Sequence, residues 1–597
     1  MTYVYVSQTS RGGSDANDGI SPRTPKLTLA AASALLASAG DVLFVDRKST
    51  FVGEKIDAVD GCYYDGWSWD YDVEGVPTLL SATNETRVEG NKAAIDRNSV
   101  AAGTYCIQCL DVDDVTIAGF NIIQGENVFI RRGACANIVL CNVIVTDPGV
   151  SSFTVYDDVS SVGSCTFYGC TSEGNSNGDG FTNRHDTADT AIGCLASGHD
   201  GISPAGDGWT SHNGSGWTLL RCISRNNTDG ADMTGSGAHL ITDSTFDSNL
   251  GDGVKTGSAA PLTIRGSTMN SNGGWGLRMD GSGAVVSERC TTNSNGQDGV
   301  TLTSTSNFTA THHTSNSNVA AGFRVIGTTT TRNFTRCVSN LNGTNGVHVT
   351  VPGTYTIDGH EAIANVGSGI LFNPTSSSSV LNLYNSVLVS PTTGLSNRAT
   401  LEVPTAAAAT VLVEAYNNTF HNRHDGGAIN HYSIFFGSTV TLTLDLVSNV
   451  FAAHMTNSRA YHIIMNGTVA VQAVAINRNV YKPVTSNHSR FRDGAVSTYT
   501  FATWQAVVGT PDLNSLNTDP AFYGLPADTI ADHYRIPLLS SPAKTVAGSN
   551  LFSSGVSRDF RGRHRPSSGN WQAGAFLVGV SAGSRLNGGV LTHIFDD

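Results

Sequence analysis

Apolar and polar positions alternate along short stretches that return at a fixed interval between residues 226 and 372. In each stretch a glycine precedes an apolar, a mostly polar and a mostly apolar residue, as in Gly276-Leu277-Arg278-Met279. The glycines that open these stretches are Gly230, Gly253, Gly276, Gly299, Gly322, Gly346 and Gly369, at intervals of 23 or 24 residues. Alternation with a period of two predicts a half-buried β-strand. Strands that return at this interval predict a solenoid of stacked coils.

An asparagine stands four residues before each of these glycines, as Asn249 does before Gly253. Both residue types tolerate the left-handed backbone of a tight corner, and stacked asparagines can hydrogen-bond from coil to coil. No helical run of about ten residues fits between the corners. The sequence therefore predicts an all-β fold, a three-sided parallel β-helix with rungs ~4.8 Å apart.

The two ends of the chain carry a family resemblance. The opening contains Gly13-Ser14-Asp15-Ala16-Asn17-Asp18-Gly19, and the close contains Thr518-Asp519-Pro520-Ala521-Phe522 and Asp559-Phe560-Arg561-Gly562. With the repeats between them, residues 3–578 resemble the right-handed parallel β-helix, pectin-lyase-like superfamily, in its secreted and phage-borne branch. The resemblance implies action on a bacterial surface or extracellular polysaccharide, as in phage tailspike depolymerases. It leaves the reaction open, because this scaffold hosts hydrolases, lyases, epimerases and inert spikes.

The predicted organisation follows the regularity of the repeats. Residues 1–50 form an N-terminal cap with a strand and a capping helix over 27–39, which would cover the open end of the core. Residues 51–400 form the β-helix with coils of about 23 residues. Residues 401–580 continue it with longer loops, and residues 581–597 form a tail.

Composition and net charge limit the kinds of molecule that the protein could bind. A net charge of −14 gives nucleic-acid binding no electrostatic support. The sequence contains no apolar run of about 18 residues, so we expect no membrane span. Met1 to Val6 lacks the basic and apolar regions of a signal peptide. The resemblance then implies a virion or extracellular location, other virion tail proteins as partners and a homotrimer. The 11 cysteines are expected to be buried free thiols, and no zinc-type spacing predicts a metal or cofactor.

The spacing becomes irregular between residues 171 and 240. If Gly180, Gly201 and Gly230 are the corner glycines, the coils have 21 and 29 residues, with an insertion over 205–216. Asp186 and Asp207 then both stand six residues after a corner glycine, on adjacent rungs roughly 5 Å apart. That separation is typical of a retaining glycosidase pair, in which one raised pKa supplies a general acid. The alternative is that both aspartates form turns. The aromatic and polar residues of the insertion, Trp209 and His212, are further candidates for substrate binding.

A second candidate site is the polar position of the regular strands. The residues at this position are Asp232, Lys255, Arg278, Thr301, Arg324 and His348. They should project outward from one sheet, one rung apart, and Asp280 should face the same way. Guanidinium groups in such a line could bind the carboxylates of an acidic polysaccharide. The alternative is a solvated sheet face.

Four functions remain open at this point. A hydrolase would use Asp186 and Asp207, with Asp232 as a further carboxylate. A lyase would need His185 or Lys255 as a base and an arginine to neutralise a uronate. An epimerase has weaker support, because Asp179-Gly180-Phe181 matches only the start of the mannuronan epimerase signature. A non-catalytic spike or adhesin would only bind glycans.

Overall fold

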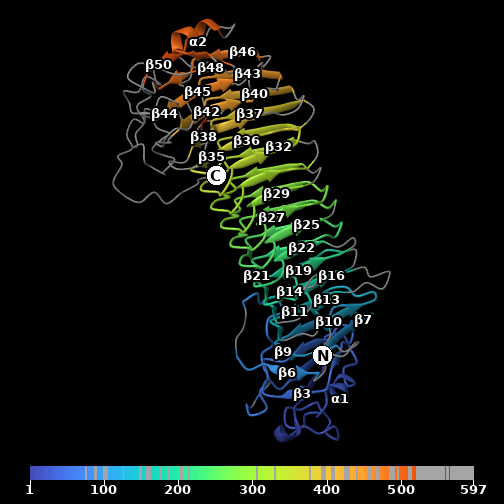
Figure 1. Ribbon diagram of the computed structural model, residues 1–597. Helices are drawn as coiled ribbons and strands as arrows, with labels where there is room; N and C mark the ends of the chain where they lie inside the picture. The colour runs from blue at the N-terminus through green and yellow to red at the C-terminus, as the bar shows by residue number, and fades with distance from the viewer. Residues whose placement is uncertain are drawn as a thin grey trace.

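The computed structural model describes residues 1–518 outside a set of gaps, together with Asp559 and His564. The gaps are 74, 76, 87–89, 98–104, 125–126, 147–150, 156–162, 175–177, 185–186, 202–205, 213–215, 258, 304–306, 328–330, 376–377, 391–398, 405–409, 423–430, 438–440, 454–459, 466–470, 483–490, 494–496 and 508–513. The described residues form a long, gently curved column of stacked coils (Figure 1). The predicted tail over 581–597 lies outside the described residues.

Three parallel sheets, called A, B and C here, run along the column and make its three sides. Sheet A contains β1 (Tyr3–Val6), β2 (Val42–Val45), β5 (Tyr63–Asp65), β8 (Thr116–Ala118), β11 (Ile138–Cys141), β14 (Cys165–Tyr168), β17 (Asp189–Ile192), β20 (Trp217–Leu220), β23 (His239–Thr242), β26 (Leu262–Arg265), β28 (Val285–Glu288), β30 (Phe308–Thr311), β32 (Thr331–Thr335), β34 (Thr354–Asp358), β37 (Ser379–Tyr384), β40 (Thr410–Tyr416), β43 (Thr441–Val447) and β46 (Val471–Asn477).

Sheet C contains β4 (Ile56–Asp57), β7 (Ile107–Leu110), β10 (Asn127–Arg132), β13 (Ser151–Val155), β16 (Phe181–Asn183), β19 (Trp209–Ser211), β22 (Ala231–Met233), β25 (Val254–Thr256), β27 (Leu277–Met279), β29 (Val300–Leu302), β31 (Phe323–Val325), β33 (Val347–Val349), β36 (Ile370–Phe372), β39 (Ala399–Val403), β42 (His431–Phe436), β45 (Ala460–Met465), β48 (Phe491–Asp493) and β49 (Ser497–Tyr499). Each strand pairs in parallel with the strand of the next coil, and β49 alone in this sheet turns back antiparallel on β48.

Sheet B contains β3 (Thr50–Val52), β6 (Ala93–Asp96), β9 (Phe120–Ile123), β12 (Ile144–Thr146), β15 (Thr171–Glu173), β18 (Leu195–Ser197), β21 (Ile223–Arg225), β24 (Thr245–Phe246), β35 (Glu361–Ile363), β38 (Val387–Val389), β41 (Thr419–Asn422), β44 (Val450–Ala453), β47 (Val480–Tyr481) and β50 (Leu516–Asn517). Between β24 and β35 this side narrows to single bridges, one residue per coil, that run from Thr245 to Glu361. The predicted three-sided parallel β-helix is therefore confirmed.

The alternation read from the sequence decides which side chains fill the core. In sheet C, Leu277 pairs with Val300, which pairs with Phe323, and all three are fully buried. The residue after each of these faces outward, because successive side chains of a strand point to opposite faces. One apolar column thus runs through the coils, and the polar column lies outside it.

The corner asparagines stack as predicted. Nδ2 of Asn272 donates to Oδ1 of Asn295 at 3.1 Å, and Asn295 donates in the same way to Asn318 at 3.0 Å. The same oxygens accept the backbone N–H of the preceding coil, as Asn295 does from Asn272 at 3.0 Å. These buried bonds satisfy corner groups that no strand could reach.

Short helices close both ends of the column. Strand β1 pairs with β2, and η1 (Thr9–Arg11) and α1 (Leu29–Ser33) lie at this end, where Leu29 and Ala32 enter the core. The helix is shorter than the predicted 27–39, because the carboxylate of Asp41 accepts the N–H groups of Ala37 and Ser38 and holds a turn there. At the other end α2 (Phe501–Val507) buries Trp504 against the last coils.

All 11 cysteines are buried and free, as expected. Among the described residues, none of the helices is long and apolar enough to cross a membrane.

Candidate functional site

The strand pairing corrects the register around the irregular coils. Phe181 pairs with Trp209, and Trp209 pairs with Ala231, so the coils here have 28 and 22 residues. The corner glycine is therefore Gly208 and not Gly201, and Asp207 is the counterpart of Asp179. The register from which Asp207 was paired with Asp186 was wrong, because it counted Asp207 from Gly201 instead of Gly208. Asp186 and His185 themselves lie outside the described residues.

The residue before each corner glycine forms a column on the outside of sheet C, called the aspartate column here. Its acidic members in this part of the chain are Asp179, Asp207, Asp229 and Asp252. Oδ1 of each accepts the backbone N–H of the next column residue, at 3.1, 3.0 and 2.6 Å for the first three. These carboxylates replace backbone acceptors that the corner lacks, so each coil is bonded to the next.

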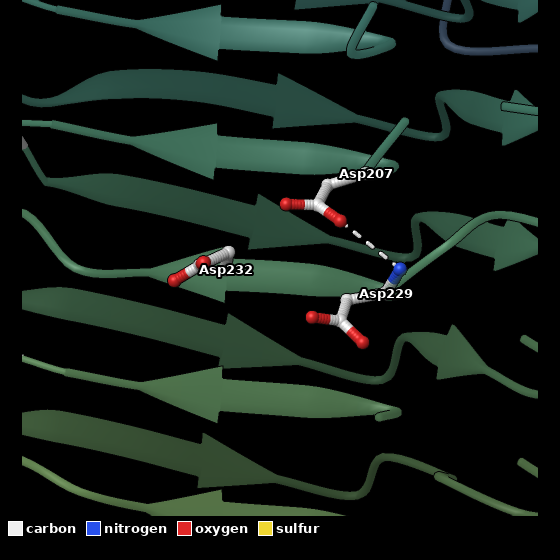
Figure 2. Close-up of side chains that lie close together, drawn as sticks. All are labelled: Asp207, Asp229 and Asp232. Carbon is white, nitrogen blue, oxygen red and sulfur yellow. Dashed lines mark hydrogen bonds between the residues drawn. The ribbon is translucent and has the colours of Figure 1, made fainter. Parts of the chain in front are cut away.

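Three carboxylates converge where this column passes β22. Asp207 precedes β19, Asp229 precedes β22, and Asp232 lies within β22 with its neighbours Ala231 and Met233 in the core. Figure 2 shows Asp207 on one rung and Asp229 with Asp232 on the next, and one oxygen of each lies within 4.8 Å of the others. We call Asp207, Asp229 and Asp232 the carboxylate cluster. The sequence singled out Asp207 and Asp232, but not Asp229.

Asp207 and Asp232 differ in the groups that surround them. Burial, together with the charges of Asp179, Asp229 and Asp232, raises the pKa of Asp207 to about 9. Burial also raises the pKa of Asp232, but Lys255 opposes this rise with Nζ at 3.1 Å from Oδ2. Asp207 is therefore protonated near neutral pH, whereas Asp232 has a fixed cationic partner.

Two polar atoms at the cluster have no hydrogen-bond partner among the residues that the structure describes. Oγ1 of Thr210 and Oδ1 of Asp232 are buried without a hydrogen bond. In other coils the equivalent threonine bonds its column aspartate, as Thr301 does to Asp298 at 2.8 Å. Unsatisfied buried groups are uncommon, and each calls for an explanation such as a ligand that completes the site.

The cluster has the ligand type of a divalent cation site, because three carboxylate oxygens within 4.8 Å offer the hard ligands that Ca²⁺ prefers. A cation bound there requires all three groups to be ionised. A protonated Asp207 and a bound cation are thus alternative states of the same residues.

The predicted outward line along sheet C is confirmed. Asp232 pairs with Lys255, and the line continues through the residues predicted. The remaining members in register are Arg278, Thr301, Arg324 and His348. Burial, followed by the charge of Arg324, lowers the pKa of His348.

The cations of this line have carboxylates beside them. Nε of Arg278 lies 2.7 Å from Oδ2 of Asp280, and NH1 lies 3.8 Å from Asp252. NH1 of Arg324 lies 3.7 Å from Asp298. With Lys255 bound to Asp232, all three cations have a carboxylate within 4 Å. This arrangement leaves them less available to an anionic ligand than the sequence suggested.

The two residues predicted from the insertion have different positions. Trp209 is fully buried and stacks on Phe181 with ring centroids 5.2 Å apart, so its prediction as a substrate-binding residue was wrong. It directly follows corner glycine Gly208, a position that points inward in every coil. His212 lies half-buried just after β19. Its pKa is lowered, first by burial and then by Arg184, while the charges of Asp179 and Asp232 oppose this shift. His212 therefore lies near the cluster and stays a candidate.

One family model matches part of the chain and supports the observed fold. Residues 190–339 and 229–385 match the family model described as "Right handed beta helix region". The chain is thus a right-handed parallel β-helix in architecture. No curated protein matches the chain.

Three solved structures are similar to this chain at low sequence identity and low TM-score. The Dettilon tailspike protein is 13% identical over 69% of this chain and 68% of its own, with a TM-score of 0.33. A pectate lyase is 13% identical over 96% of both chains, with a TM-score of 0.25. A periplasmic alginate epimerase is 8% identical over 61% of this chain and 77% of its own, with a TM-score of 0.23.

Proposed function

We propose that this protein is a glycoside hydrolase that cleaves a bacterial surface or extracellular polysaccharide at the carboxylate cluster. One observation carries the proposal. Asp207 is buried, its pKa is raised to about 9, and its carboxylate lies within 4.8 Å of those of Asp229 and Asp232. An acid that keeps its proton beside a carboxylate with a cationic partner is the pair that glycoside cleavage needs.

The roles follow from the charge states. Asp207 gives its proton to the glycosidic oxygen as the bond to the anomeric carbon breaks. Asp232 attacks that carbon and forms a covalent glycosyl intermediate, because an oxygen of each carboxyl group lies within 4.8 Å of the other, short of the ~6.5–9.5 Å that inverting enzymes need for a water. Water then attacks the intermediate and gives its proton back to Asp207, which frees Asp232 and restores the resting state. Lys255 keeps Asp232 ionised, and Asp229 helps to return the proton to Asp207.

The net charge of the protein surface around the cluster indicates whether the bound polymer is neutral or acidic. Around the cluster, carboxylates outnumber the three cations Lys255, Arg278 and Arg324. The carboxylates are Asp229, Asp232, Asp252, Asp280 and Asp298, and Asp207 adds no charge while it is protonated. A polyanion laid across this face would meet net negative charge. A neutral polymer is therefore favoured over the acidic polymer expected from the sequence. A virion or extracellular location, a homotrimer and virion tail partners remain proposals from the family resemblance.

The test compares wild type with Asp207→Asn and Asp232→Asn on purified neutral and acidic polysaccharides, followed by sizing and reducing-end counts. Removal of a general acid costs about 10²–10⁴ in rate, so each variant should lose cleavage while still binding the polymer. Asp243→Asn is the matched control, because Asp243 is an exposed corner residue on sheet A of the same region. Full activity in Asp207→Asn would overturn the proposal.

The same digest separates hydrolysis from elimination. A lyase would create unsaturated sugar ends, which absorb in the ultraviolet, whereas hydrolysis creates none. Lys255 is poorly suited as a lyase base: burial lowers its pKa, but the charge of Asp232 outweighs this and raises it, so the amine stays protonated. Unsaturated ends in the products would contradict the hydrolase proposal.

A further inference from the structure

Trp275 interrupts the aspartate column two coils beyond Asp229. Its strand β27 follows β25 and β22 in sheet C, so Trp275 occupies the place that Asp229 and Asp252 fill in the two preceding coils. Its backbone N–H donates to Oδ1 of Asp252 at 3.0 Å, as column residues do. The side chain is only partly buried. An indole thus stands on the outer face of sheet C, in line with the carboxylate cluster.

The indole is held in one orientation by its neighbours. Nε1–H donates to Oδ2 of Asp298 at 3.2 Å, and the guanidinium of Arg278 lies 4.6 Å from the ring centroid. Arg278 is itself anchored by Asp280 and Asp252. None of these contacts buries the ring in the core, so the large apolar surface of Trp275 does not serve the packing of the solenoid.

We propose that Trp275, with Arg278, forms a sugar-binding subsite for the polysaccharide that the carboxylate cluster cleaves. The inference rests on the proposed function and extends it. Two rungs separate Trp275 from Asp229, about 10 Å at the usual spacing, a distance on the scale of two linked sugar rings. A polymer that lies along the column would have its scissile bond at the cluster and a ring against the indole. Indole binds the apolar face of a sugar, while the anchored guanidinium and carboxylates bind its hydroxyls.

The direction of the polymer follows from this placement. The subsite and the cluster share one column on one sheet, so the polymer axis would run parallel to the solenoid axis, across the strands. Arg278 covers part of the ring, so sugar binding should either displace the guanidinium or use the exposed remainder of the ring. In both cases sugar binding requires the indole, and a smaller aromatic ring at this position should retain only part of the affinity.

The test measures binding in an Asp207→Asn background, so that cleavage cannot consume the polymer. Native electrophoresis through gels that contain dextran, xylan, polygalacturonate, alginate or purified bacterial capsular polysaccharides gives the affinity for each. Trp275→Ala should weaken retardation by the bound polymer about tenfold, and Trp275→Phe should restore part of it. Trp67→Ala is the matched control, a partly exposed tryptophan near the N-terminal end of the column. Thermal unfolding confirms that each variant is folded.

The outcomes separate this subsite from the proposed function. Cleavage by the wild type, with binding unchanged in Trp275→Ala, would overturn the subsite and leave the hydrolase intact. Binding that depends on Trp275 without any cleavage would support the subsite and overturn the hydrolase. Failure to bind every polymer in the panel would overturn both. In the otherwise wild-type enzyme, Trp275→Ala should raise KM with little change in kcat, because the subsite is remote from the reacting bond.

Discussion

The backbone N–H of Asp229 donates a 3.0 Å hydrogen bond to Oδ1 of Asp207, so a corner bond of the solenoid ends on the proposed acid (Figure 2). This bond stabilises the ionised form of Asp207, but burial and three nearby carboxylates outweigh it and raise the pKa to about 9. One oxygen is thus committed to the fold, and the other carries the proton. The same residue links two coils and supplies the acid.

The pH dependence of cleavage should show the state of Asp207. The acid must be protonated, so kcat should fall as pH rises through the pKa of about 9. Rates measured from neutral to alkaline pH, on the polymer that the wild type cleaves, give this alkaline limb of the pH–rate profile. A limb that lies below neutral pH would contradict the assignment of Asp207 as the acid.

Stability should depend on pH through the same group. The folded pKa of about 9 lies above the ordinary value of 3.8, so the contribution of Asp207 to stability is full below 3.8 and is lost as pH rises through 9. Asp207→Asn removes this dependence and still offers an oxygen to the N–H of Asp229. The Tm of Asp207→Asn minus that of wild type should therefore increase from acid to alkaline pH. Asp243→Asn, an Asp→Asn change at an exposed position, is the matched control.

Lys255 should control the acid limb of activity. Burial raises the pKa of Asp232, and the Lys255 ammonium lowers it. Lys255→Met removes the cation and keeps most of the apolar stem, so the pKa of Asp232 should rise further. The nucleophile must be ionised, so the acid limb of kcat/KM should move to higher pH. Arg324→Met, three coils away on the same line, should leave the limb in place. An unchanged limb in Lys255→Met would argue against Asp232 as the nucleophile.

The asparagine ladder should carry much of the local stability. Oδ1 of Asn295 accepts both the N–H and the Nδ2 of Asn272, and its Nδ2 donates to Asn318. Asn295→Ala leaves buried donors of Asn272 unpaired, at a cost of about 1–3 kcal/mol each. Amide hydrogen exchange in coils β27 to β31 should speed up most, because a solenoid is coupled chiefly to its nearest coils. Gln297→Ala, at an exposed position of the same corner, should leave exchange unchanged.

The sequence predicted the regular coils well and the irregular coils poorly, for a physical reason. From Gly230 to Gly369 every coil has 23 or 24 residues, so counting alone places Lys255 beside Arg278. Before Gly230 two Asp-Gly pairs compete for one corner, and local sequence does not distinguish them. The core decides between them, because Trp209 after Gly208 stacks on Phe181 inside the column.

The carboxylates beside the cations were also missed. Strand register fixes the position of each Cα atom, but the side-chain rotamer determines whether Arg278 contacts a polymer or Asp280. Asp229 was missed because an aspartate directly before a corner glycine is already explained as a turn former. The available signal for the cluster was an aspartate within a strand, Asp232, three residues after the column aspartate Asp229.

Divalent cations should compete with the catalytic proton for the carboxylate cluster. A cation needs Asp207 ionised, and the general acid needs it protonated, so Ca²⁺ should inhibit cleavage more strongly as pH rises. The same competition should let millimolar Ca²⁺ raise the Tm of wild type more at alkaline than at acid pH. Asp207→Asn, which has lost one ligand charge, should gain less from Ca²⁺ at every pH. A chelator should leave wild-type cleavage unchanged. Loss of activity with the chelator and recovery with Ca²⁺ would instead show that the three carboxylates work as a cation site, and Asp207 would then not be the acid.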